Sequence, residues 1–344
     1  MQHIAVLISG TLCPIRLVRF FFAQKSVEVS LLKGKGVEKM LTQAIQLKKG
    51  IHSVREMSAS DIERILDLAR DFKAGRAVRR FSNKTVALFF CENSTRTKLS
   101  FELAAQRLGA NVLDLDQDTS SILKGESLKD TVMTLEAMGA DCIVIRHSQS
   151  GITRHLQQYV NIPIINAGDG WADHPSQSLL DLMTISEYKR ISGLKVLIAG
   201  DVLHSRVARS NKVALEKLGA KVEFTGPLTL MPPKTPKAKW PESLTETDVL
   251  ILLRLQKERQ KEGLIGSLSE YHRMYGLTEE HLKLLPEDAL ILHPGPVNRG
   301  VEVAESVLMD RRAKVLHQVA NGVYVRMALI SLAFEGSGLI EVSA

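Results

Sequence analysis

Residues 85–97 read TVALFFCENSTRT, a short apolar run followed at once by a cluster of polar side chains. A continuous apolar run of this length is typical of a strand that is buried on both faces of a parallel sheet. From Thr95 to Leu108 the apolar residues recur at helical spacing, and Gly109 is placed to end that helix. A buried strand that leads through a polar turn into a helix is the repeating unit of an α/β fold.

The same alternation of strand and helix continues along most of the chain. Further buried strands are expected at 111–115, 142–146, 163–166, 194–199, 221–225, 249–253 and 289–292. Further helices are expected at 58–72, 126–138, 151–159, 174–189, 206–218 and 319–334, with a Pro/Lys-rich loop at 227–241 and a long polar stretch at 256–276. The alternation restarts near residues 191–193, and 344 residues are enough for two cores. We therefore expect two doubly wound α/β domains, each with a central parallel sheet flanked by helices.

Composition narrows the classes of function. Hydrophobic residues make up 44% of the chain and charged residues 24%, which are ordinary values for a folded protein. The net charge of +7 suits nucleic acid, an anionic membrane or small anionic ligands, and simple solubility would also explain it. The basic residues are spread along the chain and aromatic residues are only 5%, which disfavours nucleic acid. No apolar run reaches the roughly 20 residues of a membrane-spanning helix, so no membrane partner is expected.

The cysteines and the first 39 residues bear on the cellular compartment in which the protein works. Cys13, Cys91 and Cys142 match no metal or redox spacing, which indicates a reducing compartment, and we expect the cytoplasm. Residues 1–27 contain no Asp or Glu, so a transit-like segment is one interpretation, whereas a signal peptide fits poorly. Because Met40 opens an ordinary amphipathic stretch, we favour either an unstructured extension at 1–39 or a segment upstream of the true start.

The polar cluster at residues 91–97 is the first candidate site. Ligands of doubly wound folds bind beyond the carboxyl ends of the strands, which is where this cluster lies. Ser94, Thr95 and Thr97 bring hydroxyls, Arg96 brings a planar fork of N–H donors, and the helix start brings unpaired backbone N–H groups. Together they predict a phosphate site. The alternative is simple capping of the helix by Ser94 or Thr95.

Other predicted strand ends and helix starts also carry polar residues. They are Ser120 and Lys124 in a loop, Arg146, the pair His174 and Gln177, Arg206, Arg254 with Gln256, and the turn His293-Pro294-Gly295-Pro296. A neutral histidine at a helix start can donate to a carbonyl oxygen, two arginines suit two carboxylates, and a Pro/Gly turn exposes carbonyls that can hold an NH2 group. Taken singly, a surface cation, a capping histidine or an ordinary turn explains each of them about as well or better.

Several kinds of chemistry find no support in the pattern. There is no Gly-x-Ser-x-Gly elbow, no Walker loop and no zinc spacing, and the dinucleotide glycine fingerprint is missing after the first strand. We therefore expect no metal and no organic cofactor. Anion and carbonyl clamps divided between two domains suit transfer between two anionic substrates, catalysed by positioning and electrostatics.

In their order along the chain, these motifs resemble the aspartate/ornithine carbamoyltransferase family. The resemblance rests on Ser94-Thr95-Arg96-Thr97, Lys124-Gly125-Glu126, Arg146, His174-Pro175-Ser176-Gln177, Arg254-Leu255-Gln256 and His293-Pro294-Gly295-Pro296, and it runs from about Met40 to the last helix. Ornithine-type members typically have Cys where Ser176 stands and a His-Cys-Leu-Pro turn. The chain is therefore more similar to aspartate-type members, since Arg254 would attract a carboxylate and repel a cationic side chain.

The resemblance implies a reaction and a role for each residue. It implies transfer of the carbamoyl group of carbamoyl phosphate to L-aspartate, the committed step of de novo pyrimidine biosynthesis. The phosphate would be held by Ser94, Thr95, Arg96, Thr97 and Arg146. The carbamoyl oxygen would be polarised by Thr97, Arg146 and His174, and the carbamoyl NH2 would be held by Gln177 and the carbonyls of Pro294 and Gly295. Aspartate would be bound by Lys124, Arg206, Arg254 and Gln256.

The resemblance also implies domains and partners. The carbamoyl-phosphate-binding domain would comprise residues 40–190 with the last helix, about 317–336, and the aspartate-binding domain residues 191–316. Ser120 and Lys124 would reach the site of a neighbouring subunit in a homotrimer, and a regulatory chain or a dihydroorotase could join a larger assembly. The alternatives are an ornithine carbamoyltransferase, a non-catalytic scaffold of the same fold, and a dinucleotide-dependent oxidoreductase.

Overall fold

The computed structural model describes residues 16–22, 25–31, 50–115, 126–255 and 266–336, the first two ranges by their backbone alone. Residues 16–31 contain two antiparallel strands, β1 (Arg16–Phe22) and β2 (Lys25–Leu31), within a unit that is separate from residues 47–344. The sequence analysis did not predict these strands. The signal for β2 is the alternation of Val27, Val29 and Leu31 with polar residues, which is typical of a strand.

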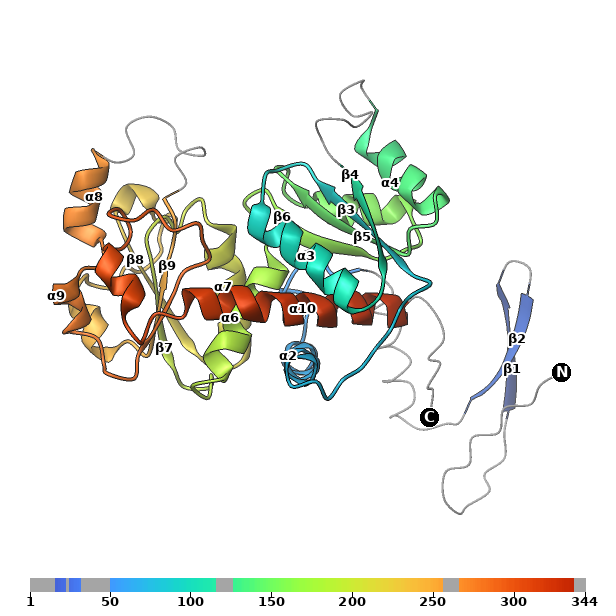
Figure 1. The fold of residues 1–344 in the computed structure, drawn as a ribbon, viewed down its shortest axis with the longest axis horizontal. Helices are drawn as coiled ribbons and strands as arrows, with labels where there is room; N and C mark the ends of the chain where they lie inside the picture. The colour runs from blue at the N-terminus through green and yellow to red at the C-terminus, as the bar shows by residue number, and fades with distance from the viewer. Residues whose placement is uncertain (1–15, 23–24, 32–49, 116–125, 256–265, 337–344) are drawn as a thin grey trace, which may run out of the picture. The chain divides into compact units, whose positions relative to one another are not determined.

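The larger unit contains two parallel sheets of four strands (Figure 1). The first has the order β4-β3-β5-β6 and is built from β3 (Thr85–Phe90), β4 (Asn111–Leu115), β5 (Cys142–His147) and β6 (Ile164–Asp169). The second has the order β10-β9-β7-β8 and is built from β7 (Lys195–Ala199), β8 (Lys221–Thr225), β9 (Val249–Leu252) and β10 (Leu290–Leu292). The predicted class of two doubly wound α/β domains is confirmed.

The apolar runs are continuous because both faces of each sheet are covered. Val86 and Leu88 of β3 point into one core with α2 (Ala59–Lys73), α3 (Thr95–Arg107) and α6 (Pro175–Ser186). Ala87 and Phe89 point into another core on the opposite face with α4 (Leu128–Ala137) and α5 (Ile152–Leu156). Such strands are apolar at every position, as the sequence analysis expected.

The second sheet follows the same rule. Val196 of β7 packs in the core that contains α7 (Arg206–Lys217), while Leu197 packs in a separate core on the other face. The polar stretch after residue 256 contains a helix that the sequence analysis missed, α8 (Leu268–Tyr275), and α9 (Glu279–Leu282) follows it. The Ser267 side chain accepts a hydrogen bond from the Glu270 backbone N–H, so a cap rather than an apolar stripe marks where α8 begins.

The last helix, α10 (Val315–Gly336), begins before the predicted residue 319. It packs mainly against α2, α3 and α6, which belong to the first half of the chain, although it follows the last strand of the second sheet (Figure 1). Most of its residues are buried, including Gln318 and Arg326. This return of the chain brings two polar side chains from its C-terminal part beside the loops of the first sheet.

Candidate active site

Loops that follow strands of both sheets line a cavity of about 420 Å³. The first sheet contributes residues 93–97 after β3, Arg146 at the end of β5, and His174 and Gln177 at the start of α6. In each case the side chain lies at the carboxyl end of a parallel strand or in the segment that follows it. This is the edge where ligands of doubly wound folds bind.

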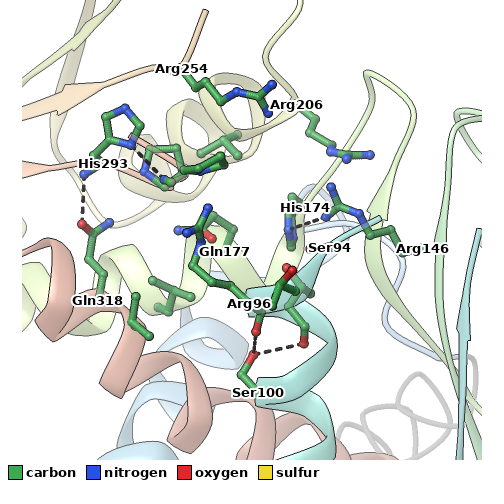
Figure 2. Close-up of a pocket in the computed structure, with 18 of the residues that line it drawn as sticks. Ser94, Arg96, Ser100, Arg146, His174, Gln177, Arg206, Arg254, His293 and Gln318 are labelled. Atoms are coloured by element: carbon green, nitrogen blue, oxygen red, sulfur yellow. Dashed lines mark hydrogen bonds between the residues drawn. The ribbon is translucent and has the colours of Figure 1, made fainter. Parts of the chain in front are cut away.

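The second sheet faces the same cavity. Arg206 is the first residue of α7, Arg254 follows β9, and residues 293–296 form the turn after β10. Figure 2 shows the side chains of Arg206 and Arg254 on one side of the pocket and those of Ser94 and Arg96 on the other. The cavity therefore receives cationic groups from both halves of the chain.

Every predicted site residue within the described ranges lines this cavity. They are Ser94, Thr95, Arg96, Thr97, Arg146, His174, Gln177, Arg206, Arg254, Pro294 and Gly295. Ser120, Lys124 and Gln256 lie outside the described residues. The structure thus brings together residues that are far apart in the sequence.

The start of α3 supplies the groups that an anion needs. Ser94 is the N-cap residue, yet its side chain makes no capping hydrogen bond, so its hydroxyl is not used by the helix. The first turn of α3 contains Arg96 and no acidic residue. The first backbone N–H groups of a helix have no partner within the helix, and the helix dipole is positive at this end. The capping alternative for Ser94 is therefore not what the structure shows.

Two of the arginines at the cavity lie beside the same carboxylate, that of Glu92. Glu92 accepts a hydrogen bond from Arg206, with 2.7 Å between Nη2 and Oε2, and its Oε2 lies 3.5 Å from Nε of Arg146. Burial and then the nearby guanidinium of Arg254 lower the pKa of Arg96. Two cations that destabilise each other's charge across a cavity favour an anionic ligand between them.

His174 and Arg146 lie in contact. Nη1 of Arg146 is 3.4 Å from Nε2 of His174 and 3.2 Å from the carbonyl oxygen of Ala167 (Figure 2). A guanidinium can only donate, so a hydrogen bond at this point requires the imidazole nitrogen to accept, which a neutral histidine can do. The imidazole of His174 is thus held beside the Arg146 guanidinium, and the resemblance implies that both groups contact the same substrate oxygen.

The turn at residues 293–296 lies directly against Arg96. Gly295 has a φ of +68°, which favours glycine, and a Cβ placed on it would be 2.9 Å from Cζ of Arg96, so a larger residue would push the guanidinium aside. The Gly295 backbone N–H donates to Nδ1 of His293 at 2.8 Å. Burial, with Arg96 and Arg254 second, lowers the pKa of His293 to about 3. His293 is therefore neutral and holds the turn, a role that the sequence analysis did not assign.

Sequence reasoning missed several polar residues around the site. Gln318 and Arg326 of α10 line the cavity, and their distance in the sequence from the strand ends gave no local signal. Glu92 lies within the quoted cluster, and Asp181 lies one turn after Gln177 in the predicted helix, so both were visible without an assigned role. The signal for Asp181 in the sequence was an acidic residue inside the short apolar run 179–183.

The described residues contain neither a metal-ligand cluster nor a membrane-spanning helix. Among the side chains of the described ranges, no three His, Cys, Asp or Glu residues lie together as metal ligands. None of the helices described here combines the length and the apolar character that crossing a bilayer requires.

Comparison with known proteins divides the chain into the same two parts as the two sheets do. Residues 32–187 match the family described as aspartate/ornithine carbamoyltransferase, carbamoyl-P binding domain. Residues 192–333 match the family described as aspartate/ornithine carbamoyltransferase, Asp/Orn binding domain. The break between the two matches falls between α6 and β7, where the strand-helix alternation restarts.

Individual relatives are similar over most of their length. The aspartate carbamoyltransferase catalytic subunit of Acetivibrio thermocellus is 49% identical over 296 residues, which is 83% of this chain and 95% of the relative. That of Caldanaerobacter subterraneus subsp. tengcongensis is 46% identical over 300 residues, which is 84% of this chain and 99% of the relative.

Solved structures agree in fold. A crystal structure of aspartate transcarbamoylase from Trypanosoma cruzi in complex with carbamoyl phosphate and aspartate has a TM-score of 0.75 and 29% identity, covering 83% of this chain and 97% of the other. The ligand-free form of the same enzyme has a TM-score of 0.70. Because both domain families match in order over most of the sequence, and the cavity brings together residues from five of the six motifs that carried the resemblance, this chain belongs to the aspartate/ornithine carbamoyltransferase family.

Proposed function

We propose that this protein transfers the carbamoyl group of carbamoyl phosphate to the amino group of L-aspartate, giving N-carbamoyl-L-aspartate and phosphate. This is the committed step of de novo pyrimidine biosynthesis. The observation that carries the proposal is the single cavity in which Arg96 and Arg146 from one half face Arg206 and Arg254 from the other. Two anionic substrates need cations on both sides, and relatives 46–49% identical carry the name of this enzyme.

The phosphate of carbamoyl phosphate would bind at the start of α3. Ser94, Thr95 and Thr97 offer hydroxyls and backbone N–H groups there, and Arg96 adds a planar fork of donors. Arg146 would bind the same phosphate from the end of β5. The support is that the Ser94 hydroxyl makes no cap and that no acidic side chain lies in the first turn of the helix.

The carbamoyl carbon would be attacked by the amino nitrogen of aspartate. The new C–N bond turns the carbonyl oxygen into an oxyanion, and Thr97, Arg146 and His174, which line the cavity, would stabilise that charge. The C–O bond to phosphate then breaks, its electron pair leaves with the phosphate, and the proton from the amino nitrogen goes to the departing phosphate. Gln177 and the carbonyls of Pro294 and Gly295 would hold the carbamoyl NH2. This path needs no side-chain nucleophile.

The aspartate carboxylates would bind to Arg206 and Arg254. Arg206 is buried and already bonded to Glu92, so its guanidinium is fixed in place before the substrate arrives. The resemblance adds Lys124 and Gln256 to this half, with Ser120 and Lys124 coming from a neighbouring subunit. Acceptance of ornithine is disfavoured, because its cationic side chain would face two guanidinium groups.

We further propose a homotrimer of catalytic chains, with the domain division of 40–190 plus about 317–336 and 191–316. Support for a subunit contact comes from α3, where Leu99 and Leu103 are 56% and 38% exposed on one helical face. Among the described cysteines, Cys91 and Cys142 are free thiols, which is in keeping with a reducing, cytoplasmic setting. A regulatory chain or a dihydroorotase in a larger assembly stays a proposal from the resemblance alone.

The test is an assay of carbamoylated product with carbamoyl phosphate and either aspartate or ornithine as acceptor. Product with aspartate alone is the expected result. Product with ornithine alone would refute the assignment of Arg206 and Arg254 but leave the phosphate site standing. A chain that sediments as a folded trimer and makes neither product would refute the enzymatic proposal in favour of a scaffold.

A further inference from the structure

Asp181 lies beneath the cavity and is fully buried. It belongs to α6, one helical turn after Gln177, and its carboxylate accepts hydrogen bonds from three side-chain amides. Nε2 of Gln177 lies 2.9 Å from Oδ1, Nε2 of Gln318 lies 2.7 Å from Oδ1, and Nδ2 of Asn211 lies 2.7 Å from Oδ2. These amides come from α6, α10 and α7, so one carboxylate joins three elements around the site.

The ionised carboxylate decides which way each amide points. It can only accept, so each amide turns its NH2 group toward Asp181 and its oxygen away from it. The freed oxygen of Gln318 accepts the backbone N–H of His293 at 2.9 Å, which holds the turn of residues 293–296 (Figure 2). The oxygen of Gln177 is likewise turned away from Asp181, and Gln177 lines the cavity. A substrate NH2 group, which is a donor, therefore meets an acceptor.

The surroundings favour an ionised carboxylate at neutral pH even though it is buried. Three amide donors and the nearby positive charge of Arg326 oppose the effect of burial, so that the pKa of Asp181 rises only to about 6. Hydrogen bonds to a charged acceptor are roughly twice as strong as those between neutral groups. A neutral residue in its place would hold the three amides less firmly and would not force a common orientation.

We propose that Asp181 is the positioning residue of the subsite for the carbamoyl NH2 group, acting through Gln177 and, by way of Gln318, through the turn at 293–296. The proposal rests on the proposed function, because it concerns which acyl phosphate that cavity accepts. Its consequence is chemical selectivity. The cavity distinguishes the NH2 of carbamoyl phosphate from the CH3 of acetyl phosphate, which has the same phosphate and carbonyl but no donor.

The experiment compares the purified full-length wild type with Asp181→Asn. Asparagine keeps the shape but is neutral, so its oxygen would hold the NH2 groups of Gln177 and Gln318 less firmly than the carboxylate does, and in the opposite orientation it would meet them with its own NH2 group. We measure dissociation constants for carbamoyl phosphate, acetyl phosphate and inorganic phosphate by calorimetry. The ratio of acetyl to carbamoyl phosphate constants should fall by about tenfold in the variant, the effect of one lost hydrogen bond. The constant for inorganic phosphate should stay within about twofold.

Two further variants separate positioning from a general structural defect. Gln318→Met releases the turn without touching Gln177, and it should lower the same ratio by a smaller factor. Glu302→Gln changes another buried carboxylate, one that bonds the backbone of Leu255 and Asn298, and it should leave the ratio unchanged. An unchanged ratio in Asp181→Asn, or an equal loss of affinity for all three ligands, would overturn the proposal.

The failure of the proposed function would look different. Binding of the three phosphates needs no turnover, so the ratio can be measured even in a protein that makes no carbamoyl-aspartate. Wild-type protein that discriminates between the two acyl phosphates but forms no product refutes the reaction alone. Wild-type protein that reacts normally, beside an Asp181→Asn variant with an unaltered ratio, refutes the positioning role alone.

Discussion

Replacing Arg206 by leucine should weaken the binding of aspartate and leave the binding of carbamoyl phosphate nearly unchanged. Arg206 is 4% exposed, donates to Glu92 at 2.7 Å and to the carbonyl oxygen of Gly170 at 3.1 Å, and opens onto the cavity at the start of α7. It is fixed by these two bonds before any ligand binds, so its contact with a substrate carboxylate needs little further ordering. Arg206→Leu removes the charge and its donors from a buried position at the edge of the cavity.

The size of the effect follows from that burial. Truncating one partner of a buried, hydrogen-bonded charge pair costs about 2–4 kcal/mol, so the KM for aspartate should rise by about 30-fold to 1,000-fold. Glu92 keeps a partner, because its Oε2 also lies 3.5 Å from Nε of Arg146. The free energy of unfolding should therefore fall by only about 1–3 kcal/mol, and the KM for carbamoyl phosphate should change by less than about threefold.

The assay measures initial rates of carbamoyl-aspartate formation with one substrate varied at a saturating level of the other. The matched control is Lys212→Leu, which removes a positive charge from the same helix but from a surface pair with Glu216. Its KM for aspartate should match that of the wild type. A KM for aspartate that rises less than about fivefold in Arg206→Leu would refute the carboxylate clamp. An equal rise for both substrates would show that the residue supports the cavity as a whole.

Three more outcomes follow from the structure. Gly295→Ala should raise the KM for carbamoyl phosphate about tenfold in the same assay, because its Cβ would meet the Arg96 guanidinium and the left-handed backbone costs about 1–2 kcal/mol; an unchanged KM would contradict this. Glu302→Gln should raise the KM for aspartate alone, since Glu302 accepts the backbone N–H of Leu255, next to Arg254; equal changes for both substrates would count against it. Burial holds the pKa of Asp181 at about 6, above its usual 3.8, so the stability this gives is complete below about pH 4 and is lost as pH rises through 6. Urea unfolding at pH 4 and 7 should show the wild type losing about 3 kcal/mol relative to Asp181→Asn, and parallel curves would refute it.

The site residues at the strand ends could be predicted because, in a parallel sheet, the position of a residue in the sequence pattern determines the edge of the sheet at which it lies. A polar residue directly after a continuous apolar run, as Arg254 is after β9, must lie at the carboxyl edge of a parallel sheet. That rule needs no knowledge of the elements that pack nearby. The residues that it selected, Arg146, His174, Arg206 and Arg254, line one cavity in the structure. The order of the motifs then added the family, from which the roles of the residues were taken.

Other features depend on packing that no local pattern contains. Gln318 reaches the site only because α10 returns across α6, and the apolar pattern of α10 indicates a buried helix without saying against what. The helix α8 was missed because it is short, has Tyr271 as its only fully buried residue and lies within a polar stretch. The strand β2 was missed because two signals compete in this segment: residues 1–27 lack acidic side chains, as targeting segments do, while Val27, Val29 and Leu31 alternate as in a strand.

If Asp181 orients the amides as proposed, a cavity that catalyses without a side-chain nucleophile still needs a charged residue outside it. A reaction catalysed by positioning depends on the orientation of neutral groups such as the Gln177 amide and the carbonyls of a turn, and an amide is nearly symmetric in shape. Shape alone cannot choose between its two orientations, whereas a buried charge can, because the wrong one places an oxygen against an oxygen. The arginines proposed to bind substrate and the carboxylate proposed to orient the amides would thus perform separate tasks. A variant that affects only the second task should alter which acyl phosphate is bound without altering how phosphate itself is held.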